Sequence, residues 1–136
     1  MANALKLFSP EWCVAAQKVT NETKAIYDGF KDPKAFTMKM AFGCSDRDLS
    51  THLEWNQGKL DYWGPPKYGE DELSLVINAS VETWREAAEG RSEGGVLLMA
   101  GKIKFEKGPM SAAIENASAF NAFLRSWGQV PTDWDV

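Results

Sequence analysis

The sequence of 136 residues is poor in the groups that most enzymes use for catalysis. It has one histidine, His52, and two cysteines, Cys13 and Cys44, and these residues do not have the spacing of a zinc site. It also lacks a glycine-rich phosphate loop and a Gly-x-Ser-x-Gly turn for a serine nucleophile. We therefore expect no catalytic residue, no metal site and no cofactor.

The three candidate nucleophiles and bases also have an ordinary structural explanation. His52 lies on the polar face of an expected strand, without a carboxylate or cysteine at a related local spacing, so we interpret it as solvent-facing rather than as a catalytic base. Cys13 and Cys44 have no nearby basic partner in the sequence that would lower their pKa. We interpret both as free thiols that serve as small packing residues.

Charge of one sign is not concentrated anywhere in the chain. There are 15 basic and 19 acidic residues, and Lys and Arg are scattered singly, which excludes the basic stripe that nucleic acid requires. No run approaches the roughly 18 apolar residues of a membrane span, and the first residues, MANALKLF, do not resemble a signal peptide. We expect a cytoplasmic protein without a transmembrane segment, whose contact with membranes is at most transient.

Aromatic residues, in contrast, are abundant. Six Trp, seven Phe and three Tyr supply a large apolar area that must enter a core, a cavity or an interface. A chain of this length is expected to fold as one domain, residues 1–136, with one core.

Three segments carry helix signals. Ser9, Pro10 and Glu11 form a helix start, after which apolar residues recur every three or four positions as far as residues 28–29. Ser80 caps a second helix that stops at Gly90, and residues 109–127 carry the apolar stripe of a third. A single helical turn is expected at 96–100, and the tail at 129–136 is expected to be irregular.

Five segments carry strand signals. Apolar and polar residues alternate over 36–42, 50–55, 60–62, 73–79 and 102–105, and Gly58 marks a hairpin between the second and third strands. The order of elements predicts an α+β fold with a five-stranded mixed or antiparallel sheet and helices on one face. Four methionines, at positions 38, 40, 99 and 110, fall on expected inward faces, and the pattern alone does not distinguish a filled core from a cavity.

Two stretches resemble a known family. "LSLVINASVETWREAAEG" gives a strand followed by a capped helix, and "MAGKIKFEKGPMSAAIENASAFNAFL" gives Gly-Lys-Ile-Lys, a glycine turn and a helix with one apolar face. In this order they resemble the sterol carrier protein 2 domain family from about Leu73 to Trp127, and more loosely from Trp12 to Tyr62. The chain departs from the family at Gly94 and Gly95, and a Ser-Lys-Leu peroxisomal signal is absent.

The resemblance implies a non-enzymatic protein that binds, transfers or presents fatty acids, fatty acyl-CoA, sterols or similar lipids in an apolar tunnel between sheet and helices. Such a site needs adaptable apolar walls and few polar anchors. The family's contacts map onto twelve residues of this sequence, namely Phe36, Met38, Met40, Trp55, Trp84, Val96, Leu97, Met99, Ile103, Met110, Ile114 and Phe120. The turn at residues 96–99 is expected to lie over the cavity.

Two other functions remain open at this point. The chain could be a dimerising or substrate-presenting module for a separate catalytic partner, with Trp63, Tyr68 and Trp134 as candidate exposed aromatics. It could also be a small α+β enzyme acting on an apolar substrate, which would require an acid or base inside the cavity.

Overall fold

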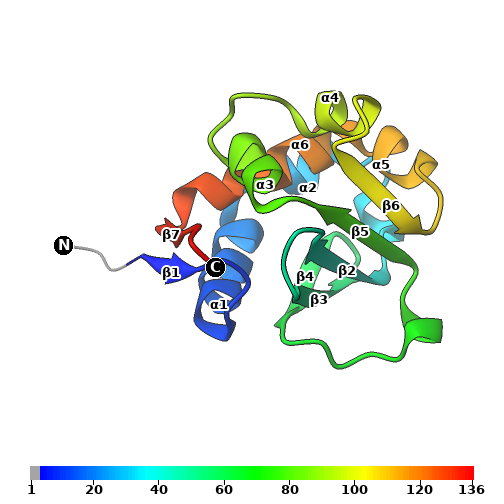
Figure 1. The fold of residues 1–136 in the computed structure, drawn as a ribbon. Coiled ribbons are helices and arrows are strands. Elements are labelled where there is room, and N and C mark those ends of the chain that lie inside the picture. The colour runs from blue at the N-terminus through cyan, green and yellow to red at the C-terminus, as the bar shows by residue number, and fades with distance from the viewer. Residues whose placement is uncertain (1–3) are drawn as a thin grey trace.

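The computed structural model describes residues 4–136, which form short helices packed on a mixed sheet (Figure 1). The strands are β1 (Leu5–Lys6), β2 (Met38–Cys44), β3 (Leu49–Asn56), β4 (Lys59–Gly64), β5 (Leu75–Ala79), β6 (Ile103–Lys107) and β7 (Thr132–Asp133). The α-helices are α1 (Pro10–Glu22), α2 (Lys24–Gly29), α3 (Val81–Ala88), α4 (Gly94–Met99), α5 (Ser111–Glu115) and α6 (Ala117–Ser126). Three 3₁₀ turns complete the described part, η1 (Pro33–Ala35), η2 (Glu70–Glu72) and η3 (Trp127–Gln129).

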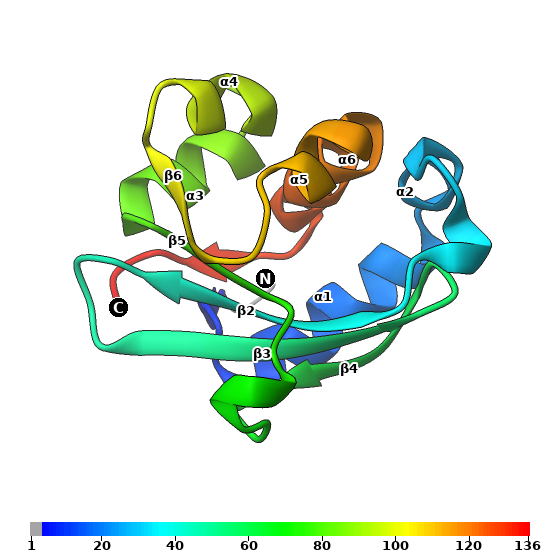
Figure 2. The same ribbon diagram turned by 90° about the vertical axis from the view of Figure 1, so that its right-hand side faces the viewer.

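The main sheet has five strands in the order β4-β3-β2-β5-β6, which confirms the predicted α+β fold and shows that the sheet is mixed. β2 pairs antiparallel with β3 and parallel with β5, and β5 pairs antiparallel with β6. The hairpin at Gly58 is also as predicted, because Gln57 and Gly58 both have positive φ between β3 and β4. Figure 2 shows the helices on one side of this sheet and the η2 loop on the other.

The first helix is interrupted, although the sequence predicts one helix to residues 28–29. The backbone of Thr23 is extended and separates α1 from α2. The hydroxyl of Thr23 donates to the carbonyl of Val19 at 2.7 Å, and Asn21 binds the edge strand β4 instead of facing solvent. Its amide exchanges two hydrogen bonds of 2.9 Å with the backbone of Leu60, which satisfies groups on the open edge of the sheet.

The last helix is also interrupted, at Asn116, where the sequence predicts a continuous helix. Asn116 has φ −112° and ψ 34°, outside the helical region, and its side chain bridges two segments. Its Nδ2 donates to the carbonyl of Ala112 at 2.8 Å, while its Oδ1 accepts from the amide of Lys31 at 2.9 Å. These bonds fix the short helix α5 and the end of α2 to the same point.

The C-terminal tail has regular structure at three residues, because Gln129 ends η3 and Thr132–Asp133 form β7, so the expectation of an irregular tail is wrong for these residues. β7 pairs in parallel with β1, with Leu5 opposite Thr132 and Lys6 opposite Asp133. The indole nitrogen of Trp12 donates to the hydroxyl of Thr132 at 2.9 Å, which joins this ribbon to α1. Trp134, a candidate exposed aromatic in the sequence, is half-buried against the core.

Much of the aromatic content forms a solid core. Trp127 packs against Phe42, Trp12 and Trp84 with ring centroids 5.4 to 5.7 Å apart, and these four side chains are buried. Trp63 is also buried, so the prediction of an exposed aromatic at this position is wrong. The inner face of the sheet is therefore filled beneath α1, α3 and η3, and any cavity must lie elsewhere.

Candidate functional site

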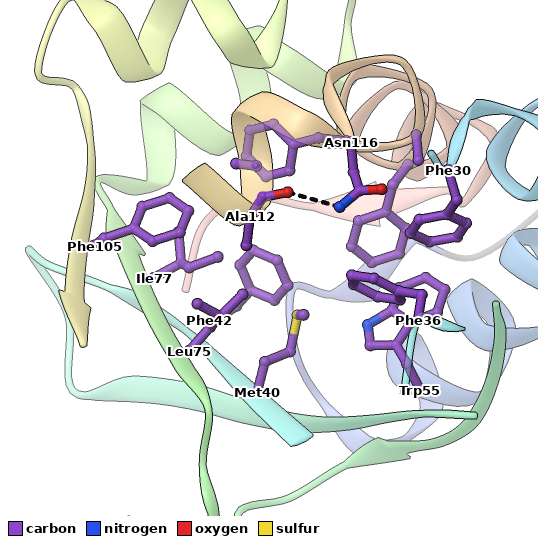
Figure 3. A pocket seen from close by; sticks show the side chains of 14 residues that line it. Phe30, Phe36, Met40, Phe42, Trp55, Leu75, Ile77, Phe105, Ala112 and Asn116 are labelled. Carbon is purple, nitrogen blue, oxygen red and sulfur yellow. Dashed lines mark hydrogen bonds between the residues drawn. The ribbon is translucent and has the colours of Figure 1, made fainter. Parts of the chain in front are cut away.

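A narrow apolar pocket lies between the inner face of the sheet and helices α5 and α6 (Figure 3). Strands β2, β5 and β6 supply its floor, α5 and α6 its roof, and the segment that follows α2 a side wall. Its fourteen lining residues are Phe30, Phe36, Met40, Phe42, Trp55, Leu75, Ile77, Phe105, Ala112, Ala113, Asn116, Ala119, Phe120 and Phe123.

The floor follows from strand alternation. Met40 and Phe42 are two residues apart on β2, so both point to the same face. They lie opposite Leu75 and Ile77 on the parallel neighbour β5, and Ile77 lies opposite Phe105 on β6. Three adjacent strands thus present a continuous apolar surface to the helices.

The roof and the side wall differ in bulk. In the roof, alanines at positions 112, 113 and 119 present small side chains, whereas Phe120 and Phe123 of α6 present large ones. In the side wall, the rings of Phe30 and Phe36 stack 4.3 Å apart, and the ring of Trp55 meets both of them edge-on at 5.5 Å. The site therefore has a roof of small and aromatic side chains and an aromatic side wall.

The pocket is narrow and partly open to solvent. Its cavity volume is about 40 Å³. This volume is room for only about three waters, at roughly 10–15 Å³ each. A ligand the size of a lipid fits only if the roof moves away from the floor.

The chemistry of the lining is apolar. Among the fourteen residues that line the pocket none is ionisable, and the polar side-chain atoms belong to Asn116 and to the indole nitrogen of Trp55. Groups of three or more His, Cys, Asp or Glu that could hold a metal ion are absent from residues 4–136. The walls can exclude water and enclose an apolar molecule, and they offer no acid or base for general catalysis.

Comparison with solved structures identifies the architecture. A crystal structure of sterol carrier protein 2 superposes with a TM-score of 0.77 at 21% identity, over 92% of this chain and 99% of that one. The chain has the sterol carrier protein 2 fold. A conserved hypothetical protein of Thermus thermophilus, described as possibly a sterol carrier protein, gives a TM-score of 0.73 at 23% identity over 97% and 94% of the two chains. A ubiquinone synthesis protein, UbiJ-SCP2, gives 0.59 at 11% identity over 93% and 95%.

Sequence comparison adds little to the structural likeness. No family model matches the chain. A curated relative, the outer membrane usher protein CS3-2 of Escherichia coli, is 34% identical over 100 residues, which are 68% of this chain. The chain spans only 11% of the length of that usher, so the match is a local similarity of sequence. At these identities the solved structures establish the sterol carrier protein 2 fold.

The structure brings together four of the twelve residues that the sequence predicts as ligand contacts. Phe36, Met40, Trp55 and Phe120 line the pocket. Met38 is half-buried and pairs with Trp55 across the β2–β3 ladder, outside the lining. Trp84, Leu97 and Ile103 are buried in the core, where the indole nitrogen of Trp84 donates to the carbonyl of Gly43 at 2.9 Å.

The other four predicted residues lie on the surface. Val96, Met99, Met110 and Ile114 are 59%, 77%, 40% and 58% exposed, so the inward orientation expected for Met99 and Met110 is wrong. The physical reason is that α4 has only six residues and turns Leu97 and Leu98 inward, which leaves Val96 and Met99 outside. The roof of the pocket is formed by α5 and α6, and α4 does not cover it as the sequence suggested.

Some lining residues were absent from the predicted set. Phe42, Leu75, Ile77 and Phe105 follow the same period-two alternation as Met40, so the sequence carries a signal for them. Ala113 and Phe123 lie on the apolar stripe predicted for the last helix, whereas Ala112 and Ala119 lie beside it. Phe30 and Asn116 have no such signal, because each is placed by an irregular backbone segment.

The single histidine and the two cysteines do not line the pocket. His52 is on the polar face of β3 as predicted, but it is buried rather than solvent-facing, because the loop before η2 covers that face. Its Nδ1 accepts from the amides of Lys67 and Tyr68, both at 3.1 Å, and burial lowers its pKa. Cys13 and Cys44 are free and buried as expected, and burial raises the pKa of their thiols to about 11 and about 12.

Within residues 4–136, the helices are all too short or too polar to cross a bilayer.

Proposed function

We propose that the chain is a single lipid-binding domain that carries one apolar ligand between membranes, or presents it to another protein, without catalysing a reaction on it. The observation that carries this proposal is the pocket between the sheet and α5 and α6, whose lining contains no ionisable side chain. The sterol carrier protein 2 fold supports the same function. Fatty acids, fatty acyl-CoA and sterols are the ligand classes to test first, and the cytoplasm is the compartment that we expect.

Uptake requires the roof to open, and α5 is the segment that we propose to move. This helix is five residues long, and it carries both the lining residues Ala112 and Ala113 and the exposed residue Ile114. The energy available is sufficient, because burying ten methylenes of an acyl chain returns roughly 8 kcal/mol. That gain can offset the separation of one short helix from the sheet.

Four exposed apolar side chains give the opening a route to a lipid surface. Val96 and Met99 lie on α4, and Met110 and Ile114 lie at α5; Figure 2 shows both helices on the same side of the sheet. Exposed clusters of large apolar side chains commonly mark interaction sites. We assign these residues to transient membrane contact during loading, while Phe36, Met40, Trp55 and Phe120 contact the ligand.

Binding of a fluorescent fatty acid, together with native mass spectrometry of the purified protein, tests the proposal. We expect carried lipid in the mass spectrum and a dissociation constant in the micromolar range or below. Ala112→Trp places a large side chain in the pocket and should weaken binding at least tenfold, whereas Ala117→Trp, on the exposed start of α6, should not. Purified protein that carries no lipid and binds neither fatty acids, acyl-CoA nor sterols would refute the proposed function.

A second candidate function is an accessory role beside a catalytic partner that acts on an apolar substrate. It is favoured by the likeness to the ubiquinone synthesis protein UbiJ-SCP2 and by the exposed apolar side chains of α4 and α5. In this case the partner, or a second copy of the chain, covers that surface. Light scattering after size exclusion distinguishes the carrier from the accessory role. A monomer that binds lipid and transfers it to vesicles favours the carrier.

A further inference from the structure

Three buried tryptophans have an indole N–H without a hydrogen-bond acceptor in the described part of the chain. They are Trp55, Trp63 and Trp127. The buried indoles of Trp12 and Trp84, in contrast, donate to Thr132 and to the carbonyl of Gly43. A buried donor that loses water without gaining a partner destabilises the fold by about 1–3 kcal/mol, so each orphaned donor requires an explanation.

Trp55 differs from the other two because it lines the pocket. Its side chain is 2% exposed, and in Figure 3 its nitrogen lies on the edge of the ring that faces Met40. The rings of Phe30, Phe36 and Phe123 meet Trp55 edge-on, and an aromatic face is at best a weak acceptor. The indole N–H of Trp55 is therefore a donor without a hydrogen-bond partner in the wall of an apolar pocket.

Asn116, on the roof side, also has an unused N–H donor. Its oxygen already accepts from the amide of Lys31, and one hydrogen of its nitrogen is used by the carbonyl of Ala112. A carboxamide nitrogen carries two hydrogens, so one donor remains. The lining thus carries side-chain N–H donors on Trp55 and Asn116 and one side-chain oxygen, which already accepts one hydrogen bond.

We propose that Trp55 is a specificity-determining residue that selects apolar ligands with a carbonyl or similar hydrogen-bond acceptor over hydrocarbons of the same shape. The inference rests on the proposed lipid-binding function. Burial of the ligand pairs the indole N–H, which removes the cost of leaving it unsatisfied. The stacked Phe30 and Phe36 beside it favour a flat ring system around the acceptor.

The test compares fluorene with 9-fluorenone, two flat tricyclic molecules of nearly equal shape, of which only the second has a carbonyl oxygen. We expect fluorenone to bind about tenfold more tightly, in line with one buried hydrogen bond. Trp55→Phe should abolish this preference, so that fluorenone and fluorene have equal dissociation constants in the variant. Trp63→Phe, which removes an equally orphaned N–H outside the lining, should keep the preference.

A spectroscopic measurement on the unmodified protein keeps the inference testable if a variant folds poorly. Among the six indole N–H signals in a ¹H–¹⁵N spectrum, the signal of Trp55 should move downfield with fluorenone and less with fluorene. Equal affinities, or an unmoved Trp55 signal with fluorenone bound, overturn this inference while fatty-acid binding leaves the proposed function standing. If fatty acids and both tricyclic molecules fail to bind, both are overturned.

Discussion

Removal of the Asn116 side chain should loosen the roof of the pocket. In Asn116→Ala, the amide of Lys31 and the carbonyl of Ala112 each lose a hydrogen-bond partner, at 2.9 and 2.8 Å. Each bond contributes about 0.5–1.5 kcal/mol, and both partners are accessible enough for water to replace part of it, so we expect a loss of about 1–2 kcal/mol. Urea unfolding followed by tryptophan fluorescence measures this loss.

Hydrogen exchange should locate the effect. The amide of Lys31 should exchange faster in the variant, and fatty-acid uptake should accelerate because α5 separates more readily from the end of α2. Asn121→Ala is the matched control, since Asn121 on α6 accepts from the amide of Gly95 at 3.0 Å and so holds α4 instead. If Asn116→Ala is as stable as the natural chain and exchange at Lys31 is unchanged, Asn116 does not hold α5 to the end of α2 and the reasoning is refuted.

Further predictions concern the surface, the sheet and the polar face. Ile114→Ser should slow lipid transfer from vesicles several-fold with little change in equilibrium affinity, whereas Val14→Ser, an equally exposed apolar position on α1, should leave the transfer rate unchanged. Gly108→Ala should destabilise the fold by at least about 2 kcal/mol in urea unfolding, because Gly108 has φ +90° and an added Cβ would lie 2.4 Å from the carbonyl oxygen of Ser74. Burial lowers the pKa of His52, so its contribution to stability is complete above its unfolded pKa of about 6.5 and is lost as the pH falls through that value toward the lowered folded pKa. The free energy of unfolding should be lower at pH 5 than at pH 7.5, and His52→Gln should reduce this difference. An equal difference in both proteins would show that His52 does not cause the loss.

The fold could be predicted because its main signals are local. Alternation in β2, β3 and β5 and the Ser-capped starts of α1 and α3 depend on residues within one element. The breaks at Thr23 and Asn116 are different. Asn116 follows an apolar helical pattern, and its departure from helix depends on Lys31, which is 85 positions away in the sequence. A partner at that distance is not visible from a local pattern.

The pocket could be predicted only in part, for a related reason. Alternation and the helical stripe indicate which residues point inward, and Met40 and Phe120 do line the pocket. These patterns do not show which inward side chains pack against one another, as Trp84 packs against Phe42 and Trp127, and which ones border an empty space. The burial of His52 has the same origin, because the strand gives its face correctly while the covering loop at residues 65–69 comes from another part of the chain.

The alanine roof suggests how the choice of ligand length could be changed. Ala112, Ala113 and Ala119 lie over a floor built from strands that are hydrogen-bonded within the five-stranded sheet. Replacement of any one of them with a longer side chain would shorten the available space at a different point without altering the sheet. In a small panel of roof variants, the longest acyl chain that each variant still binds would therefore report how much of the pocket remains available beside the substituted position.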